Sequence, residues 1–311
     1  MSKMSALYPI VGLLGCSYLS LYSSVISAEN NHNVQSQVVS QWADAYASAA
    51  AVNIPRTQQF ILKDADRDYQ VMVKLPKDYQ HNSAHHYPVI YMTDGMYSMQ
   101  VVSGATRFPM NSNVMHQAIL VAIGYQKDSK DSTSRIRDYT PSHDPSWKLN
   151  TGEAKRHLRF IRDTVMPFVE HFYRIDAQQN TFMGNSLGGL FGAYVLLEQP
   201  TLFTNYVLGS PSLWFDNKQL LQRFIQDFSQ IPAISAKIFV GIGELERPPY
   251  THDNHQMVAD AQAFYQILHS HPSAKAGTLT PKLLVIPEAD HSMAFPTTAI
   301  HGLSWLFKRA D

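Results

Sequence analysis

The chain has 311 residues, of which 45% are hydrophobic and 16% are charged, and its 25 Lys and Arg balance its 25 Asp and Glu. A chain of this length and apolar content can bury one large core or two ordinary ones. A formal net charge of zero argues against binding to nucleic acid, because such binding depends on a basic surface. The single cysteine, Cys16, excludes an internal disulfide, and zinc sites built on thiolates and iron–sulfur clusters need more than one.

The N-terminal segment has the pattern of a secretory signal. Residues 4–28 contain no charged side chain, Lys3 precedes them, and Ser27 and Ala28 are small enough for cleavage at that point. We therefore expect residues 1–28 to be a signal peptide and the protein to be exported, to the periplasm or out of the cell.

Two other interpretations of the same segment remain open. It is long enough to span a bilayer as an uncleaved anchor. Residues 13–16 also resemble a bacterial lipobox, in which Cys16 would carry a lipid anchor. The sequence after Cys16 stays apolar, where a lipoprotein usually becomes polar, which favours the cleaved signal.

The rest of the chain predicts an N-terminal extension, residues 29–55, followed by one catalytic domain, residues 56–311. Apolar side chains at helical spacing, such as Trp42 and Tyr46, indicate a short helix in the extension. In the domain, strand-like runs alternate with amphipathic segments, of which residues 153–173 are the clearest. The predicted strands cover residues 59–62, 69–75, 88–92, 118–123, 181–183, 206–208, 237–241 and 282–286. This alternation is typical of an α/β fold with a mainly parallel sheet and helices on both faces.

A nucleophile motif lies between a predicted strand and a predicted helix. Residues 184–188, Gly-Asn-Ser-Leu-Gly, fit the pattern G-x-S-x-G, which lifts a serine into an exposed, strained turn at the end of a sheet strand. A glycine-rich turn without chemistry is the alternative, but the strand before it and the helix after it favour a nucleophile at Ser186.

A serine nucleophile needs a base and a carboxylate, and in the α/β-hydrolase order both follow the serine, each after a later strand. His291 follows the strand predicted at 282–286 and is the expected general base and acid. Glu246 follows the strand predicted at 237–241 and is the expected carboxylate, with Glu244 as the alternative.

The oxyanion of a tetrahedral intermediate requires two backbone donors. The N–H of Leu187, directly after the nucleophile, is the first candidate. The N–H of Met96, in the loop after the strand predicted at 88–92, is the second. An ordinary tight turn at Asp94-Gly95 is the alternative explanation for that loop.

Candidate substrate contacts are Arg137 and Trp214, and loops 97–116 and 126–151 are expected to shape an apolar, aromatic pocket. A structural ion pair for Arg137 and a packing role for Trp214 are the alternatives. The 14 histidines occur without an HExxH pattern, so we expect neither a metal nor another cofactor.

Several blocks together resemble the Putative esterase family of α/β-hydrolases, which includes enterobactin-type siderophore esterases and, more distantly, mycolyltransferases. The blocks occupy residues 87–95, 137–141, 160–161, 167–170, 184–190, 210–214, 240–246 and 290–291. The resemblance implies an α/β-hydrolase fold, a catalytic set of Ser186, His291 and Glu246, and oxyanion donors at Met96 and Leu187. It further implies siderophore or short acyl esters as substrates.

The sequence therefore predicts a serine esterase that cleaves carboxylic esters through an acyl-enzyme on Ser186 and acts on a small-molecule ester. An acyltransferase that uses the same residues and a non-catalytic binding protein on the same fold remain alternatives.

Overall fold

A computed structural model describes residue 34 and residues 37–130, 132–251 and 255–309. The predicted signal peptide, with Cys16, lies outside these residues. Internal contacts divide the chain into the units Met1–Asn53 and Ile54–Asp311. In the first unit, residues 37–47 are helical, where the sequence predicts a short helix. Within the described ranges, no helix is both long and apolar enough to cross a membrane.

The second unit is built on one sheet of eight strands, in the order β1-β2-β4-β3-β5-β6-β7-β8. All eight predicted strands are present. Their bounds are Thr57–Asp64 (β1), Arg67–Lys74 (β2), Tyr87–Met92 (β3), Ile119–Gln126 (β4), Ile175–Asn185 (β5), Asn205–Gly209 (β6), Ala236–Gly243 (β7) and Leu279–Ile286 (β8). β2 pairs antiparallel with β1 and with β4, and the other strands pair in parallel. The prediction of a mainly parallel sheet is confirmed.

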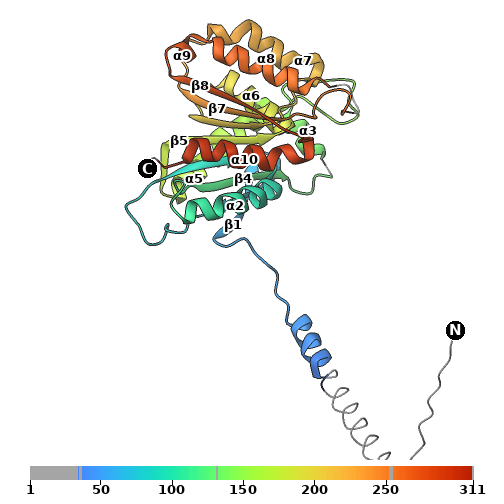
Figure 1. Cartoon of the computed structure of the whole chain (residues 1–311), viewed down its shortest axis with the longest axis vertical. Helices are drawn as coiled ribbons and strands as arrows, with labels where there is room; N and C mark the ends of the chain where they lie inside the picture. The colour runs from blue at the N-terminus through green and yellow to red at the C-terminus, as the bar shows by residue number, and fades with distance from the viewer. Residues whose placement is uncertain (1–33, 35–36, 131, 252–254, 310–311) are drawn as a thin grey trace, which may run out of the picture. The chain divides into compact units, whose positions relative to one another are not determined.

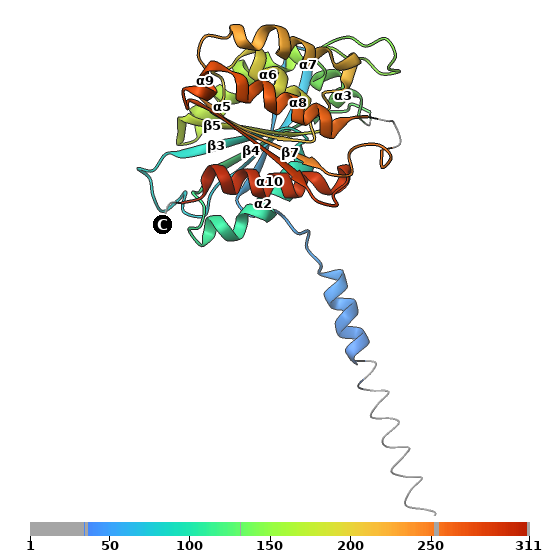
Figure 2. The ribbon, with the colours of Figure 1, turned by 45° about the horizontal axis from the view of Figure 1, so that its top comes forward.

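Helices cover both faces of this sheet. Figure 1 and Figure 2 show α2 (Gly95–Asn111) and α10 (His291–Phe307) together on one face. The other face carries α3 (Thr133–Tyr139), α4 (Ala154–Phe160), α5 (Met166–Phe172), α6 (Leu187–Glu198), α7 (Phe215–Asp227), α8 (Met257–Ser270) and α9 (Pro272–Lys275). The two layers explain why β3 is apolar and buried along its whole length, since neither of its faces meets water.

The alternation of side chains along β3 separates two cores. Val89 and Tyr91 face the larger core beneath α4 and α6, whereas Ile90 and Met92 face the core beneath α2 and α10. All four side chains are fully buried. Adjacent strand residues point to opposite faces, so a run of apolar residues supplies both cores at once.

The segment predicted as one helix over residues 153–173 is helical but not uniform. It consists of α4, a π-helical turn at Ile161–Val165, and α5. Pro167 lies near the start of α5. Residues at the start of an α-helix do not donate an α-helical hydrogen bond through their N–H, so the N–H that proline lacks is not needed there. We attribute the wider turn before it to the same ring, which would collide with the carbonyl four residues earlier in a regular helix.

His157 of α4 is an unusual member of the larger core. It is 2% exposed, and neither ring nitrogen has a hydrogen-bond partner among the described residues. Its ring packs against the aromatic rings of Tyr69, Tyr139 and Phe191, with centroids 5.4 to 5.5 Å apart. Burial lowers the pKa of His157 below its usual value of 6.5, so the folded protein holds the imidazole neutral.

This burial predicts a loss of stability in mild acid. Below about pH 6.5 the unfolded chain binds a proton at this histidine and the folded chain does not. The free energy of unfolding therefore decreases as the pH is lowered, by at most about 1.4 kcal/mol per pH unit from this group. Phe at this position cannot be protonated and leaves no unpaired nitrogen. His157→Phe should therefore show a shallower decline than the wild type when urea unfolding is compared at pH 7.5 and 5.5.

The exposed His269 provides the control, because His269→Phe should keep the wild-type pH dependence. Equal slopes in the wild type and His157→Phe would contradict the prediction.

Candidate active site

Ser186 occupies the sharp turn between β5 and α6. Its backbone angles, φ 59° and ψ −119°, lie in a strained region, and its N–H donates to the Gly209 carbonyl at 2.9 Å. A Cβ at Gly184 would lie 2.3 Å from the Gly188 carbonyl oxygen, and a Cβ at Gly188 would lie 2.3 Å from the Thr93 hydroxyl. The two glycines flanking Ser186 are therefore required by close packing, as expected for a nucleophile turn.

The structure brings Glu246 and His291 into direct contact. Glu246 follows β7, and His291 is the first residue of α10, five residues after β8 ends. Glu246 Oε2 lies 2.5 Å from His291 Nδ1. Glu246 is 1% exposed, whereas the side chain of His291 is 48% exposed. A buried carboxylate thus orients an imidazole whose other edge is accessible to a substrate.

Glu244, the alternative carboxylate, is directed elsewhere. Its Oε2 accepts from the backbone N–H of Glu288 at 3.0 Å, and its Oε1 lies 3.8 Å from an Arg247 nitrogen. Between the two glutamates, the geometry therefore favours Glu246 as the partner of His291.

The turn after β6 contacts both Glu246 and Ser186. The sequence did not predict these contacts. Ser210 Oγ donates to Glu246 Oε1 at 2.6 Å. Ser212 Oγ lies 3.3 Å from Ser186 Oγ, and Ser212 N–H donates to the Ser186 carbonyl at 3.2 Å. Ser210 directly follows β6 and Ser212 lies two residues further on, so their position just after a predicted strand was the available signal.

The two expected oxyanion donors lie in the first turns of two helices. Leu187 begins α6, and Met96 is the second residue of α2. The first N–H groups of a helix have no intrahelical partner and carry the positive end of its dipole. A Cβ at Gly188 would lie 3.2 Å from Asp94 Oδ2, so the start of α6 packs closely against the loop that begins α2.

Arg135 ties that loop to the nucleophile strand. Its Nε lies 2.6 Å from Asp94 Oδ1, and a terminal nitrogen donates to the Asn185 carbonyl at 3.2 Å. Asp94 has a positive φ of 59°, and Tyr125 also donates to its carboxylate at 2.8 Å. Burial alone would lower the pKa of Arg135, but the charge and hydrogen bonds of Asp94 outweigh it and raise the pKa overall. Asp94 is therefore part of an ion pair that joins the loop before α2 to helix α3, and not only of a tight turn.

A pocket of about 490 Å³ opens beside the serine and histidine. Its lining includes Trp214, Tyr250, His255 and Met257, and the Trp214 and His255 rings stack with centroids 3.9 Å apart. The expectation that loops 97–116 and 126–151 shape this pocket is wrong, because none of its described lining residues comes from either segment. Most of the first is α2, which turns apolar side chains into the core. In the second, Trp147 stacks on Trp214 with ring centroids 6.3 Å apart. Trp214, in contrast, does line the pocket.

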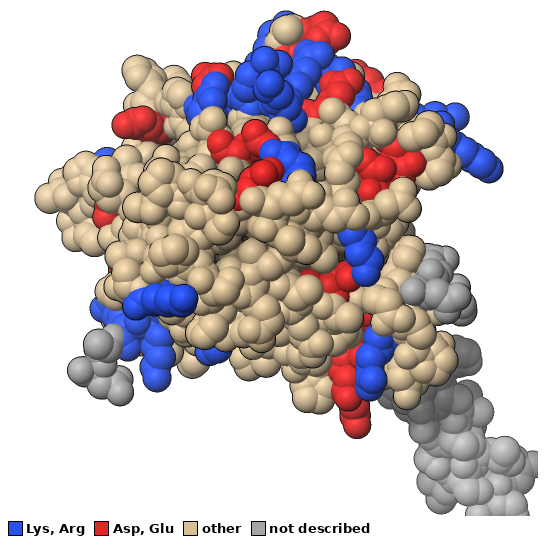
Figure 3. Space-filling model, turned by 90° about the horizontal axis from the view of Figure 1, so that it is seen from above, with Lys and Arg blue, Asp and Glu red and all other residues tan. Residues whose placement is uncertain are grey.

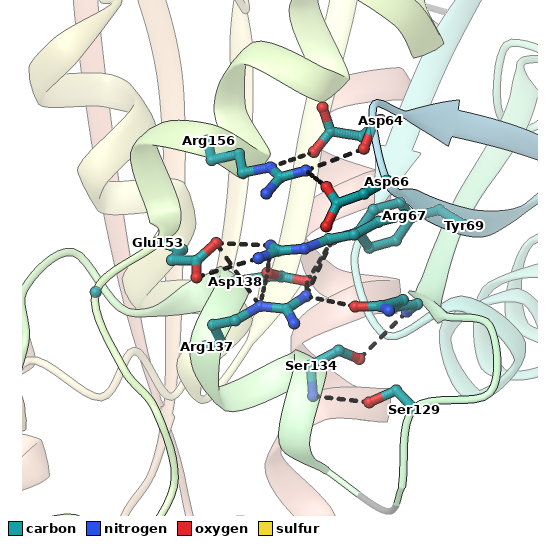
Figure 4. Close-up of polar contacts among 12 residues, drawn as sticks. Asp64, Asp66, Arg67, Tyr69, Ser129, Ser134, Arg137, Asp138, Glu153 and Arg156 are labelled. Carbon is teal, nitrogen blue, oxygen red and sulfur yellow. Dashed lines mark hydrogen bonds and ion pairs between the residues drawn. The ribbon is translucent and has the colours of Figure 1, made fainter.

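Arg137 does not line this pocket. Figure 4 shows its guanidinium with that of Arg67 among acidic and phenolic groups. Arg137 Nε donates to Asp138 Oδ1 at 2.8 Å, and Arg67 donates to Glu153 at 2.6 Å. The side chain of Arg137 is only 12% exposed, so the structure supports the structural ion pair and not the predicted contact with substrate.

Charge on the surface is mixed. On the face shown in Figure 3, basic and acidic side chains are interspersed among a majority of other residues. In the described part of the chain, no group of three or more His, Cys, Asp or Glu is placed to hold a metal ion.

Comparison with known proteins identifies the family. A family model described as Putative esterase matches residues 63–263. The chain belongs to this family. The resemblance found in the sequence is thereby confirmed, and the protein is a carboxylic ester hydrolase with the α/β-hydrolase fold.

Individual relatives of this esterase agree with the family match. The ferri-bacillibactin esterase BesA of Bacillus subtilis is 30% identical over 70% of this chain and 79% of its own length. The siderophore triacetylfusarinine C esterase of Aspergillus fumigatus is 28% identical over 64% of this chain and 71% of its own. The crystal structure of the BES protein from Bacillus cereus superposes with a TM-score of 0.71 at 26% identity, covering 83% of this chain and 97% of that one.

The ion pair between Arg135 and Asp94 predicts a large effect on stability. Arg135→Leu leaves the Asp94 carboxylate buried without its cation, which should lower the free energy of unfolding by about 3 kcal/mol in urea titrations. Arg162→Leu is the matched control, because the pair formed by Arg162 and Asp163 is exposed and its removal should cause no measurable loss. Equal losses in the two variants would contradict this account.

Proposed function

We propose that this esterase uses Ser186 as nucleophile, His291 as general base and acid, and Glu246 as the carboxylate that orients His291. The observation that carries the proposal is the 2.5 Å contact of Glu246 with His291, at the same edge of the sheet as the strained turn of Ser186. A buried carboxylate on Nδ1 fixes the tautomer in which Nε2 can accept a proton from a serine hydroxyl.

The proposed reaction has two halves. In the first, Ser186 Oγ attacks the ester carbonyl while His291 Nε2 takes the hydroxyl proton, and the resulting oxyanion binds the N–H groups of Leu187 and Met96. When the tetrahedral intermediate collapses, His291 gives the proton to the departing alcohol, and an acyl-enzyme remains. In the second half, His291 deprotonates the water that attacks the acyl-enzyme. When this second tetrahedral intermediate collapses, His291 returns the proton to Ser186 Oγ, and the acid and the free serine are released.

Two glutamates provide a matched test of this assignment. Glu246→Gln should lower kcat for a p-nitrophenyl ester by about 10³- to 10⁴-fold, because Gln cannot stabilise the imidazolium and permits the wrong tautomer. Glu244→Gln, two residues away, should retain most of the activity. Ser186→Ala sets the background rate. Comparable losses in the two glutamine variants would refute the role of Glu246.

We also propose siderophore esters as the substrates of this enzyme. The support is the names of two relatives, a ferri-bacillibactin esterase and a siderophore triacetylfusarinine C esterase, together with a pocket whose wall contains Trp214, Tyr250 and the His255 ring. Aromatic rings offer stacking surfaces to flat acyl groups.

A panel of ferric siderophores with ester backbones, assayed against p-nitrophenyl butyrate, tests the choice of substrate. We expect kcat/KM to be at least about tenfold higher for one siderophore ester than for the simple ester, which corresponds to about 1.4 kcal/mol of additional transition-state binding. Hydrolysis of the simple ester with no turnover of any siderophore would contradict the substrate proposal and leave the catalytic set intact.

Export is the remaining proposal. The uncharged run at residues 4–28 and the small residues that end it support a cleaved signal peptide, and the extracellular or periplasmic location follows from it. N-terminal sequencing of the mature protein should begin at Glu29. A mature chain that begins at a lipid-modified Cys16 would instead establish the lipoprotein.

A further inference from the structure

We propose that Ser210 is a positioning residue for catalysis: its hydroxyl holds the Glu246 carboxylate in the rotation that presents Oε2 to His291. This inference rests on the proposed function, because it acts through the same glutamate and histidine. Ser210 would be a fourth side chain beside Ser186, His291 and Glu246, and it would affect the reaction only through Glu246.

The two carboxylate oxygens of Glu246 have different hydrogen-bond partners. Oε1 accepts from Ser210 Oγ at 2.6 Å and from the Gly243 N–H at 2.8 Å. Oε2 lies 2.5 Å from His291 Nδ1. Both protein donors use Oε1, so together they fix the plane of the carboxylate and leave Oε2 for the imidazole.

Ser210 is itself rigidly placed. Its N–H donates to the Gly241 carbonyl of β7 at 2.7 Å, and its side chain is fully buried. Its φ of 38° is in the region that favours glycine, so a serine here carries backbone strain that its hydroxyl contact offsets. The hydroxyl therefore reaches Glu246 from a fixed point on the neighbouring strands.

The chemical consequence follows from the burial of Glu246. An ionised carboxylate with 1% exposure has no water to solvate it, so protein donors must keep it charged and aligned. Without the Ser210 hydroxyl, one N–H remains on Oε1 and the carboxylate can rotate away from Nδ1. The imidazolium that forms during each half-reaction is then less well stabilised.

Ser210→Ala tests the proposal through kinetics. We expect kcat for a p-nitrophenyl ester to fall about tenfold while KM changes by less than about twofold, because the lost interaction serves the transition state. The downfield proton resonance of His291 Nδ1–H should weaken or shift.

A double-mutant cycle with Glu246→Gln shows whether Ser210 acts through that glutamate. In the Glu246→Gln background, Ser210→Ala should lower kcat by less than about twofold, whereas independent roles would multiply the two losses. Ser270→Ala is the matched control, because that exposed hydroxyl also makes a hydrogen bond but lies at the end of α8. It should match the wild type.

Ser210→Gly keeps the test decisive if Ser210→Ala does not fold, since glycine adopts the positive φ without strain and equally lacks the hydroxyl. Folded Ser210 variants with wild-type kcat and an unchanged His291 proton resonance would overturn the proposal. That result, obtained with an active wild type and an inactive Ser186→Ala, would leave the proposed function standing. Loss of the proposed function itself would show as activity that survives Ser186→Ala.

Discussion

The parallel pairing of β3, β5, β6, β7 and β8 is the constraint on which the candidate site depends. Parallel strands bring their carboxyl ends to one edge of a sheet, and each of these strands ends immediately before a segment that serves the site. The loop of the proposed oxyanion donor Met96 follows β3, and the turn of the proposed nucleophile Ser186 follows β5. Ser210, Glu246 and His291 follow β6, β7 and β8. Residues more than 100 positions apart along the chain therefore lie at the same edge of the sheet.

The electrostatics of the site are local, as the balanced charge of the chain requires. A buried glutamate is tolerable only with enough donors, and Glu246 has two on one oxygen and His291 on the other. Next to Ser186 in the chain, Asn185 accepts from Arg135 through its carbonyl, and Arg135 also pairs with Asp94 in the loop before α2. Polar contacts therefore fix both the end of β5 and the carboxylate of Glu246.

The sequence was informative wherever periodicity or strand order determines position. Buried strands appear as apolar runs, and the ends of those runs point to Ser186, Glu246 and His291. The pocket wall was harder to predict from the sequence, because its rings Tyr250 and His255 follow no regular pattern and His255 is placed by stacking on Trp214. Arg137 was assigned to the substrate, since local sequence does not reveal that Asp138 and Glu153 surround it. Ser210 was missed as a positioning residue because a serine after a strand has many ordinary roles.

Peptide mapping by mass spectrometry after reaction with diisopropyl fluorophosphate tests the central claim most directly. The reagent captures the one hydroxyl that a base and an oxyanion site activate. The account predicts a stoichiometric phosphoryl adduct on Ser186, lost in His291→Ala. An adduct on Ser212, whose hydroxyl lies 3.3 Å away, or no adduct in an enzyme that hydrolyses esters, would contradict it.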